Sequence, residues 1–219
     1  MTSDLAAPAT PLTKPSYAQM RPFYRFAYNL VGLELLLCHR IKVEGRENVP
    51  AGGFLVVSNH VSYMDPTTVG WALAREIYYL GRKTLFKPPF WSWFLPCCNV
   101  LPIDRDGHDI AGLRRIIKML KEGHGVMLFP EGTRSPDGNL QTPEPGAGLV
   151  ALKAGVPVLP ARVFGTFECL SRHTKRFRPG PVRVVIGKPY LPTATEGRKD
   201  KDLYLRVAQE MMEKIAELK

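Results

Sequence analysis

The feature that most constrains the fold is an alternation of short apolar runs with segments of helical periodicity, which continues from residue 41 to the end of the chain. Short runs rich in β-branched residues are typical of buried strands, and apolar residues that recur at helical spacing indicate helices. The expected strands are 41–44, 54–58, 77–80, 100–103, 125–129, 156–164 and 182–186, and the expected helices are 66–75, 110–122, 146–154 and 202–218. This alternation predicts one α/β domain, 41–219, in which helices flank both faces of a sheet.

Two segments precede this domain. Residues 1–16 are rich in Pro, Ala and Thr, and we expect them to form a disordered tail. Residues 17–40 carry apolar and aromatic side chains at helical spacing, with basic residues around them, which predicts an N-terminal helix. Because Asn29 and Glu34 interrupt its apolar stretch, we expect this helix to lie in a membrane interface and not to cross the bilayer. A helix packed on the domain core is the alternative interpretation.

Charge and cysteine content narrow the class of partner. The formal net charge is +10, so we expect anionic partners: a nucleic acid, an anionic membrane surface or a phosphorylated small molecule. No nucleic-acid reading motif accompanies the charge, so we expect no nucleic-acid partner. The four cysteines form neither a CxxC pair nor a metal-ligand spacing, which predicts reduced thiols, a cytoplasmic location and no bound metal.

A histidine and an aspartate, His60 and Asp65, lie between the expected strand 54–58 and the expected helix 66–75. Active sites of α/β proteins lie at this edge of the sheet. There a carboxylate can fix the imidazole tautomer and stabilise the imidazolium, so His60 can act as a general base without a Ser or Cys nucleophile. Taken alone, the pair has a plainer alternative, in which Asp65 caps the helix and His60 is a polar turn residue.

A second turn follows the expected strand 125–129 and reads Pro130-Glu131-Gly132-Thr133-Arg134-Ser135. It combines an acid, a hydroxyl and a guanidinium with a glycine that permits close backbone approach. The Arg134 guanidinium suits bidentate capture of a phosphate, and Glu131 can accept a hydrogen bond from a polyol hydroxyl. Asp104 and Arg105 follow another expected strand and offer a second cation. An ordinary Pro-Gly turn with a surface ion pair is the alternative.

The order of these groups along the chain is more specific than any one of them. The sequence resembles the glycerolipid acyltransferase family that contains bacterial 1-acylglycerol-3-phosphate acyltransferase, whose four sequence blocks occur in the same order. The matching segments are Asn59-His60 with Ser62 and Asp65 (an NHxxxxD block), Ile103-Asp104-Arg105, Phe129 through Ser135, and Val156-Pro157 through Pro160. The resemblance spans roughly residues 41–186.

This resemblance implies a fold, an activity and a set of site residues. The fold is a single-domain sheet like that of glycerol-3-phosphate acyltransferase, with 41–219 as the acyltransferase domain. The activity is transfer of a fatty acyl group from acyl-CoA or acyl carrier protein to the sn-2 hydroxyl of lysophosphatidic acid, with no bound cofactor. The catalytic residues are His60, as general base, and Asp65; the substrate-binding residues are Asn59, Ser62, Arg82, Arg105, Glu131, Gly132, Thr133 and Arg134.

The expected partners are therefore a lysophospholipid acceptor, the thioester donor and an anionic membrane surface. The expected location is the cytoplasmic face of the cell membrane, as a peripheral or monotopic protein. Three departures leave the acceptor open: Arg82 where the family often has lysine, Asn99 in place of the usual glycine, and Pro-Glu-Pro-Gly at 143–146. The alternatives are an acyltransferase for another lysolipid and a non-catalytic, basic membrane-binding domain on the same scaffold.

Two further segments have structural predictions only. The aromatic segment 86–95 suits an interfacial wedge or an acyl-tunnel wall, or else packs beneath the N-terminal helix. The strand 156–164 contains two prolines, which suits a sheet edge or an acyl slot.

Overall fold

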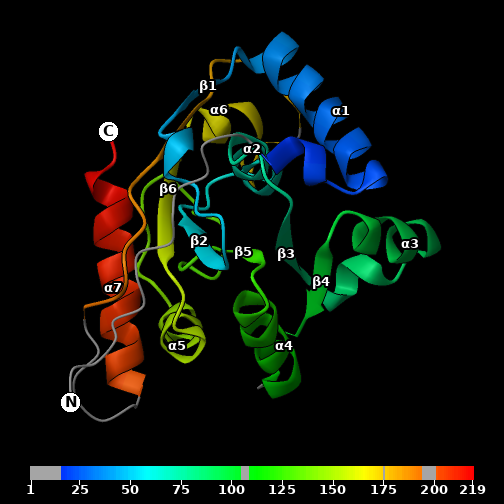
Figure 1. Cartoon of the computed structure of the whole chain (residues 1–219). Coiled ribbons are helices and arrows are strands. Elements are labelled where there is room, and N and C mark those ends of the chain that lie inside the picture. The colour runs from blue at the N-terminus through cyan, green and yellow to red at the C-terminus, as the bar shows by residue number, and fades with distance from the viewer. Residues whose placement is uncertain (1–15, 105–108, 175, 194–200) are drawn as a thin grey trace.

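A computed structural model describes residues 16–104, 109–174, 176–193 and 201–219. Seven strands form one sheet in the order β1-β7-β6-β2-β5-β3-β4 (Figure 1). They are β1 (Lys42–Glu44), β2 (Phe54–Ser58), β3 (Ile77–Arg82), β4 (Val100–Ile103), β5 (Gly125–Leu128), β6 (Val158–Phe164) and β7 (Arg183–Ile186). Neighbouring strands pair in parallel except β6 and β7, which are antiparallel. The predicted tail lies outside the described residues, apart from Ser16.

The helices predicted from periodicity are all present. The α-helices are α1 (Pro22–His39), α2 (Asp65–Ala72), α3 (Pro89–Cys97), α4 (Ile110–Lys121), α5 (Pro145–Ala154), α6 (Thr166–Leu170) and α7 (Lys201–Glu217). Short 3₁₀ helices occupy η1 (Ser16–Gln19), η2 (Arg46–Asn48) and η3 (Lys83–Phe86). The sequence analysis did not predict α3 or α6. Helix α3 is apolar on nearly every side and contains Pro96, so it lacks the periodic pattern that reveals a helix.

The core consists of two apolar layers, one on each face of the sheet. Along β2, Phe54 and Val56 belong to one layer and Leu55 and Val57 to the other, as the alternation of side chains in a strand requires. Helices α1, α2 and α6 contribute to the first layer, and α4, α5 and α7 to the second (Figure 1). The predicted α/β fold with helices on both faces is confirmed.

The proline-containing strand β6 does not lie at an edge of the sheet. It lies between β7 and β2, so the prediction of a sheet edge was wrong. Pro160 is buried opposite Val57 of β2, and its carbonyl accepts a hydrogen bond of 2.8 Å from the backbone of Gly187, just beyond β7. Proline is rare in central strands because it lacks an N–H.

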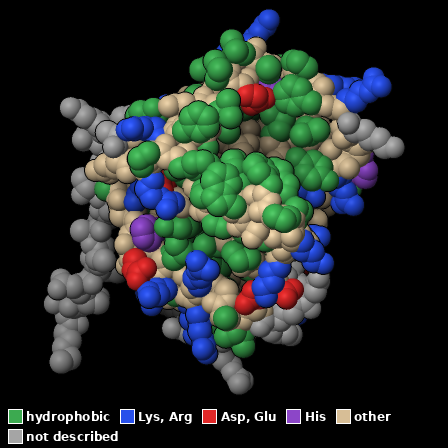
Figure 2. All heavy atoms as spheres, turned by 90° about the vertical axis from the view of Figure 1, so that its right-hand side faces the viewer, with side chains coloured by type: hydrophobic (Ala, Val, Ile, Leu, Met, Phe, Trp, Pro, Cys, Tyr) green, Lys and Arg blue, Asp and Glu red, His purple; other side chains and the backbone are tan. Residues whose placement is uncertain are grey.

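Helices α1 and α3 together carry a large apolar surface. Phe23 of α1 meets Trp93 and Phe94 of α3 at ring-centroid distances of 5.7 and 5.9 Å. The exposed side chains of this surface are Phe26, Leu30, Leu33, Leu36 and Leu37 on α1, and Phe90, Trp91 and Trp93 on α3. Hydrophobic side chains gather on the face that carries both helices, and Lys and Arg side chains lie around them (Figure 2). Within the described residues, no helix has the length and apolar character needed to cross a membrane.

Asn99, which replaces the glycine of the family pattern, has a structural reason to be asparagine. Its φ is 61°, in the left-handed region that glycine and asparagine tolerate best. Its side-chain amide donates to Glu76 Oε1 at 2.8 Å and accepts a hydrogen bond from Arg21. Arg21 also forms an ion pair of 2.7 Å with Glu76. The start of α1 is thereby tied to the ends of β3 and β4.

Close packing of α5 on α7 gives a test of this fold. A Cβ at Gly148 would lie 2.0 Å from the backbone oxygen of Tyr204, so Gly148→Ala is expected to destabilise the protein by about 1–3 kcal/mol. Gly146→Ala on the same helix is the matched control, because a Cβ there meets nothing within 4 Å. Thermal melting of both variants measures the difference. Equal melting temperatures would contradict the close contact between the helices.

Candidate active site

The two predicted groups of polar residues lie side by side at the carboxyl ends of adjacent strands. His60 follows β2, Asp65 is the first residue of α2, and the turn 130–135 follows β5. Strands β2 and β5 pair in parallel, with Val57 opposite Leu128, so both chains leave the sheet at the same edge. The parallel register therefore places the two groups together.

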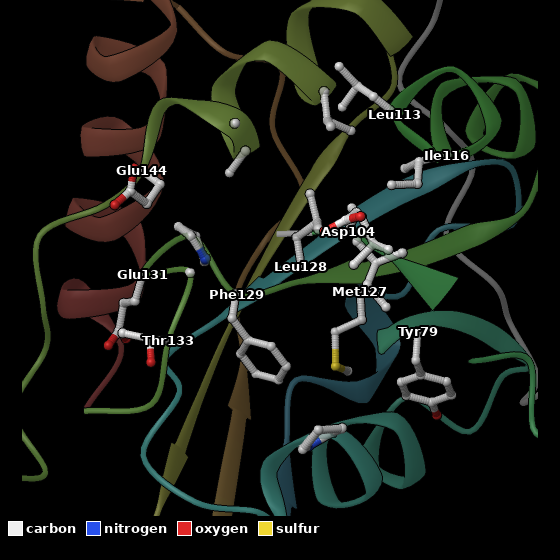
Figure 3. A pocket seen from close by; sticks show the side chains of 18 residues that line it. Tyr79, Asp104, Leu113, Ile116, Met127, Leu128, Phe129, Glu131, Thr133 and Glu144 are labelled. Carbon is white, nitrogen blue, oxygen red and sulfur yellow. The ribbon is translucent and has the colours of Figure 1, made fainter. Parts of the chain in front are cut away.

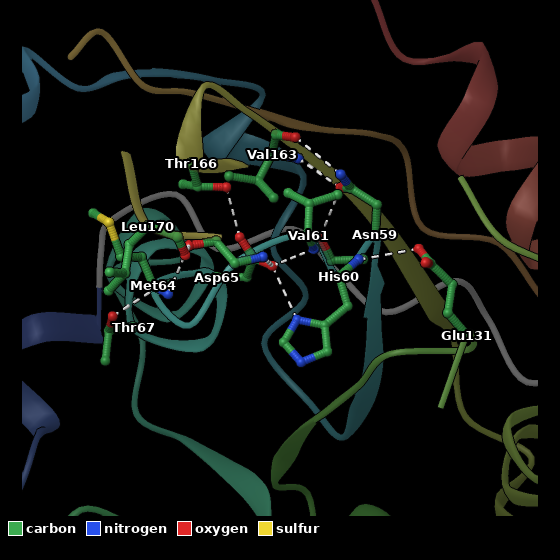
Figure 4. A network of polar contacts seen from close by, with 12 residues as sticks. Asn59, His60, Val61, Met64, Asp65, Thr67, Glu131, Val163, Thr166 and Leu170 are labelled. Atoms are coloured by element: carbon green, nitrogen blue, oxygen red, sulfur yellow. Dashed lines mark hydrogen bonds and ion pairs between the residues drawn. The ribbon is translucent and has the colours of Figure 1, made fainter. Parts of the chain in front are cut away.

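Asp65 is fully buried and accepts four hydrogen bonds (Figure 4). Its Oδ2 accepts from His60 Nδ1 at 2.9 Å and from the backbone N–H groups of Val61 and Ser62 at 2.6 and 2.7 Å. Its Oδ1 accepts from the Thr166 hydroxyl at 2.6 Å. Because a carboxylate only accepts, this network assigns the Nδ1 proton to His60 and makes Nε2 the basic nitrogen.

The second turn is bound to the backbone of His60. Glu131 Oε1 accepts a hydrogen bond of 3.0 Å from the His60 backbone N–H (Figure 4), and the Ser135 N–H donates to the His60 carbonyl at 2.7 Å. The Phe129 ring stacks on the imidazole, with centroids 4.0 Å apart. Gly132 has a φ of 67°, a conformation that favours glycine. The turn therefore has a fixed position relative to the imidazole.

Glu131 combines burial with an incomplete set of hydrogen bonds. Its side chain is 3% exposed, and burial raises its pKa to about 7, although the backbone N–H groups of His60 and Gln141 oppose the rise. Its Oε2 has no hydrogen-bond partner among the described residues. A carboxyl in this state can exchange a hydrogen bond with a ligand hydroxyl.

Arg134 projects from the same turn. Its guanidinium carbon lies 3.8 Å from the centroid of the Tyr63 ring, and the Arg172 side chain donates to its backbone carbonyl at 3.3 Å. Its Nε is buried without a hydrogen-bond partner in the described part of the chain. Nε and a terminal nitrogen form the edge with which arginine binds phosphate or carboxylate in bidentate fashion.

A cavity of about 520 Å³ adjoins this constellation (Figure 3). Its polar side chains Glu131, Thr133 and Glu144 lie together at one side, whereas Tyr79 lies at the other. Its apolar walls come from β3, β4, β5, α4 and α5, and include Leu80, Ile103, Leu113, Ile116, Met127 and Leu128. Segment 86–95 is not among the described residues that line this cavity, so its interpretation as an acyl-tunnel wall stays a prediction.

Comparison with known proteins decides the family. The family model described as Acyltransferase matches residues 40–163, which include His60, Asp65 and the turn 130–135. The chain belongs to the acyltransferase family.

Among curated relatives, the 1-acyl-sn-glycerol-3-phosphate acyltransferase of Bacillus subtilis is 33% identical over 169 residues, covering 76% of this chain and 81% of the relative. The chloroplast enzyme of that name from Arabidopsis thaliana is 33% identical over 77% of this chain, but the match covers only 49% of the plant protein. The chain thus spans about half the length of its plant relatives. The crystal structure of PlsC, the 1-acyl-sn-glycerophosphate acyltransferase of Thermotoga maritima, superposes with a TM-score of 0.66 at 28% identity, covering 90% of this chain and 77% of PlsC.

The predicted site residues of this family member fall into three groups. His60, Asp65, Glu131, Gly132, Thr133 and Arg134 lie together around the turn described above. Asn59 and Ser62 are buried, and their side chains bond the backbone of Val163 and Leu170, so their predicted contact with substrate stays a prediction. Arg82 is exposed at the end of β3 and does not line the cavity, and Arg105 lies outside the described residues.

Sequence reasoning missed two residues of the site. The Thr166 hydroxyl donates a hydrogen bond to Asp65, although the two residues are 101 positions apart in the sequence. No sequence pattern around Thr166 predicts this contact. Tyr63 lies inside the NHxxxxD block, so its proximity to His60 was evident, but its contact with Arg134 was not. In the described part of the chain, no group of His, Cys, Asp and Glu could hold a metal ion.

The raised pKa of Glu131 predicts a pH-dependent stability. Glu131 has an ordinary pKa of 4.5 in the unfolded chain and a pKa of about 7 in the folded protein. At a pH between these two values, the folded protein keeps a proton on Glu131 that the unfolded chain has released, so the free energy of unfolding falls as pH rises. Glu131→Gln cannot titrate at this position. As pH rises through this window, its free energy of unfolding is therefore expected to increase relative to that of the native protein by up to about 3 kcal/mol.

Thermal melting of the two proteins from about pH 5 to pH 8 measures this gain. The exposed Glu144 lies on the same cavity, so Glu144→Gln is the matched control for replacing a carboxylate there with an amide. A Glu131→Gln curve parallel to that of the native protein would refute the prediction.

Proposed function

We propose that this acyltransferase moves a fatty acyl group from a thioester carrier to the sn-2 hydroxyl of lysophosphatidic acid and forms phosphatidic acid. One observation carries the proposal: His60, paired with Asp65 at 2.9 Å, lies on a backbone that hydrogen-bonds the turn bearing Arg134. A base for a hydroxyl thus adjoins a binding group for a phosphate. The names of the bacterial and plant relatives support this choice of acceptor.

In the proposed reaction, His60 acts as the general base. Its Nε2 takes the proton of the acceptor hydroxyl while the oxygen attacks the thioester carbonyl carbon, and Asp65 stabilises the imidazolium that forms. The carbon–oxygen bond forms, the carbon–sulfur bond breaks, and the imidazolium returns the proton to the departing thiolate. General-base catalysis of this kind contributes about 10²–10⁴ to the rate.

The acceptor and the acyl chain occupy different parts of the site. Arg134 and the backbone at Gly132 and Thr133 bind the phosphate, and Glu131 bonds the glycerol. The cavity receives the acyl chain of the donor, because most of the residues that line it are apolar. This arrangement suits acyl-CoA and acyl carrier protein equally, since both present the acyl chain as a thioester.

The apolar surface of α1 and α3 is proposed to hold the protein on an anionic membrane, at the cytoplasmic face, as a peripheral or monotopic protein. Its exposed leucines and tryptophans supply apolar area, and the net charge of +10 adds attraction to anionic lipid. The function supports the same conclusion, because a lysophospholipid acceptor resides in the membrane.

Replacement of the base tests the reaction. His60→Ala is expected to lose turnover by about 10²–10⁴ or more, because Asp65 then has no imidazole to orient. Acyl transfer is measured with one radiolabelled acyl donor and a panel of acceptors, and the products are identified by mass.

Each possible result separates the proposal from its rivals. If the native protein makes mainly phosphatidic acid, the proposal is supported. If it mainly acylates another lysolipid, that lysolipid takes the place of lysophosphatidic acid as the acceptor. Full turnover by a folded His60→Ala variant, or no turnover of any acceptor by the native protein, would contradict the catalytic proposal. Thermal melting shows whether the variant is folded.

Replacement of exposed side chains tests membrane binding. Leu37 is 73% exposed and Phe26 is 65% exposed, so Phe26→Ser and Leu37→Ser leave the core intact. Each is expected to weaken binding to anionic vesicles about tenfold, since a fully inserted leucine contributes about 1.5–3 kcal/mol. Leu191→Ser is the control, because Leu191 is 50% exposed outside this surface. Sedimentation with vesicles measures binding, and an equal loss in all three variants would count against a membrane role of α1.

A further inference from the structure

Tyr63 is an exposed residue with a specific contact that the proposed reaction leaves unexplained. It lies between His60 and Asp65, and its side chain is 53% exposed, so it is not part of the core. The guanidinium carbon of Arg134 nevertheless lies 3.8 Å from the centroid of its ring. At this distance the cation lies against the ring face, where the attraction between an arginine and an aromatic ring is strongest.

The backbone that carries Tyr63 is held at several points. Ser62 forms an antiparallel bridge with Ser171, and the Tyr63 N–H donates to the Leu170 carbonyl at 3.3 Å. The Ser62 hydroxyl donates to the same carbonyl at 2.7 Å. The ring is thus presented from a fixed backbone.

The same bridge places a second residue against Arg134. Arg172 follows Ser171, and its guanidinium donates to the backbone carbonyl of Arg134 at 3.3 Å. Tyr63 therefore contacts the side chain of Arg134 while Arg172 holds its backbone. Neither contact uses the edge formed by Nε and a terminal nitrogen, and Nε is buried without a partner among the described residues. An anion at that edge would supply the hydrogen bond that Nε lacks.

We infer that Tyr63 is a positioning residue of the acceptor site: its ring face holds the Arg134 guanidinium so that the bidentate edge faces the phosphate of the acceptor. The inference rests on the proposed function for the identity of the anion. Because the backbone of Tyr63 belongs to the loop that orients His60, the ring also fixes the separation between base and phosphate.

The test compares ring-removing and ring-keeping variants. Tyr63→Leu removes the aromatic face but keeps an apolar side chain, and is expected to raise the KM for lysophosphatidic acid about three- to tenfold. The kcat and the KM for the thioester donor are expected to change little. Tyr63→Phe restores the ring face and is expected to return the KM close to the native value.

Two controls separate positioning from general effects of the substitution. Tyr17→Leu removes a ring from beside another arginine, Arg25, at 5.9 Å, and is expected to leave the acceptor KM unchanged. In an Arg134→Ala background, Tyr63→Leu is expected to add no further rise, since its effect acts through that guanidinium. Vesicle binding of Tyr63→Leu is expected to equal that of the native protein.

Binding of sn-glycerol 3-phosphate, followed by calorimetry, distinguishes this inference from the proposed function. Absence of native turnover with lysophosphatidic acid contradicts the function, but weaker binding of this probe by Tyr63→Leu than by Tyr63→Phe still supports the inference. Equal behaviour of the two variants overturns it. The inference is also overturned if Tyr63→Leu still raises the acceptor KM in the Arg134→Ala background, or if weaker vesicle binding accounts for the rise. A native protein that does not bind sn-glycerol 3-phosphate overturns it as well.

Discussion

The buried carboxylate of Asp65 is the interaction on which the rest of the site depends. Removing a charge from water is costly unless hydrogen bonds replace the lost solvation, and Asp65 is fully buried with four donors. Three donors come from the loop 60–62 and the fourth is Thr166, beyond β6. Each of these segments must therefore adopt its observed conformation for the charge to be satisfied. The orientation of the imidazole follows from that requirement.

The backbone of His60 joins this carboxylate to the rest of the chemistry. Its N–H and its carbonyl both bond the turn after β5, through Glu131 and Ser135. The two carboxyl groups that meet here have different surroundings: Asp65 is saturated with donors, whereas burial raises the pKa of Glu131 to about 7. Such a difference lets one carboxyl orient a base while its neighbour exchanges a proton or a hydrogen bond with a ligand. The different roles of Asp65 and Glu131 thus follow from their burial and their hydrogen-bond donors, and not from the difference between aspartate and glutamate.

Whether the sequence could predict a contact depended on how far apart its two residues lie along the chain. His60 and Asp65 are five positions apart, so a strand-to-helix turn was enough to predict their pairing. The contact of Asp65 with Thr166, 101 positions away, depends on the position of β6 beside β2, which no local pattern encodes. The stacking of Arg134 on Tyr63 likewise requires the parallel register of β2 and β5. Helix α3 was missed because its aromatic residues and proline lack helical periodicity, and Pro160 was misplaced because proline rarely occupies a central strand.

Asn99 shows how a departure from the family pattern can serve the proposed membrane geometry. A glycine would satisfy the φ of 61°, but it would offer no side chain to Glu76 or Arg21. With asparagine, the N-terminus of α1 is tied to β3 and β4, and β3 and β4 also supply Leu80 and Ile103 to the cavity. The exposed apolar surface of α1 is thereby joined to two of the strands that line the cavity. If the proposed function holds, the acyl chain of the donor enters a cavity of the same sheet whose strands hold α1 at the membrane surface.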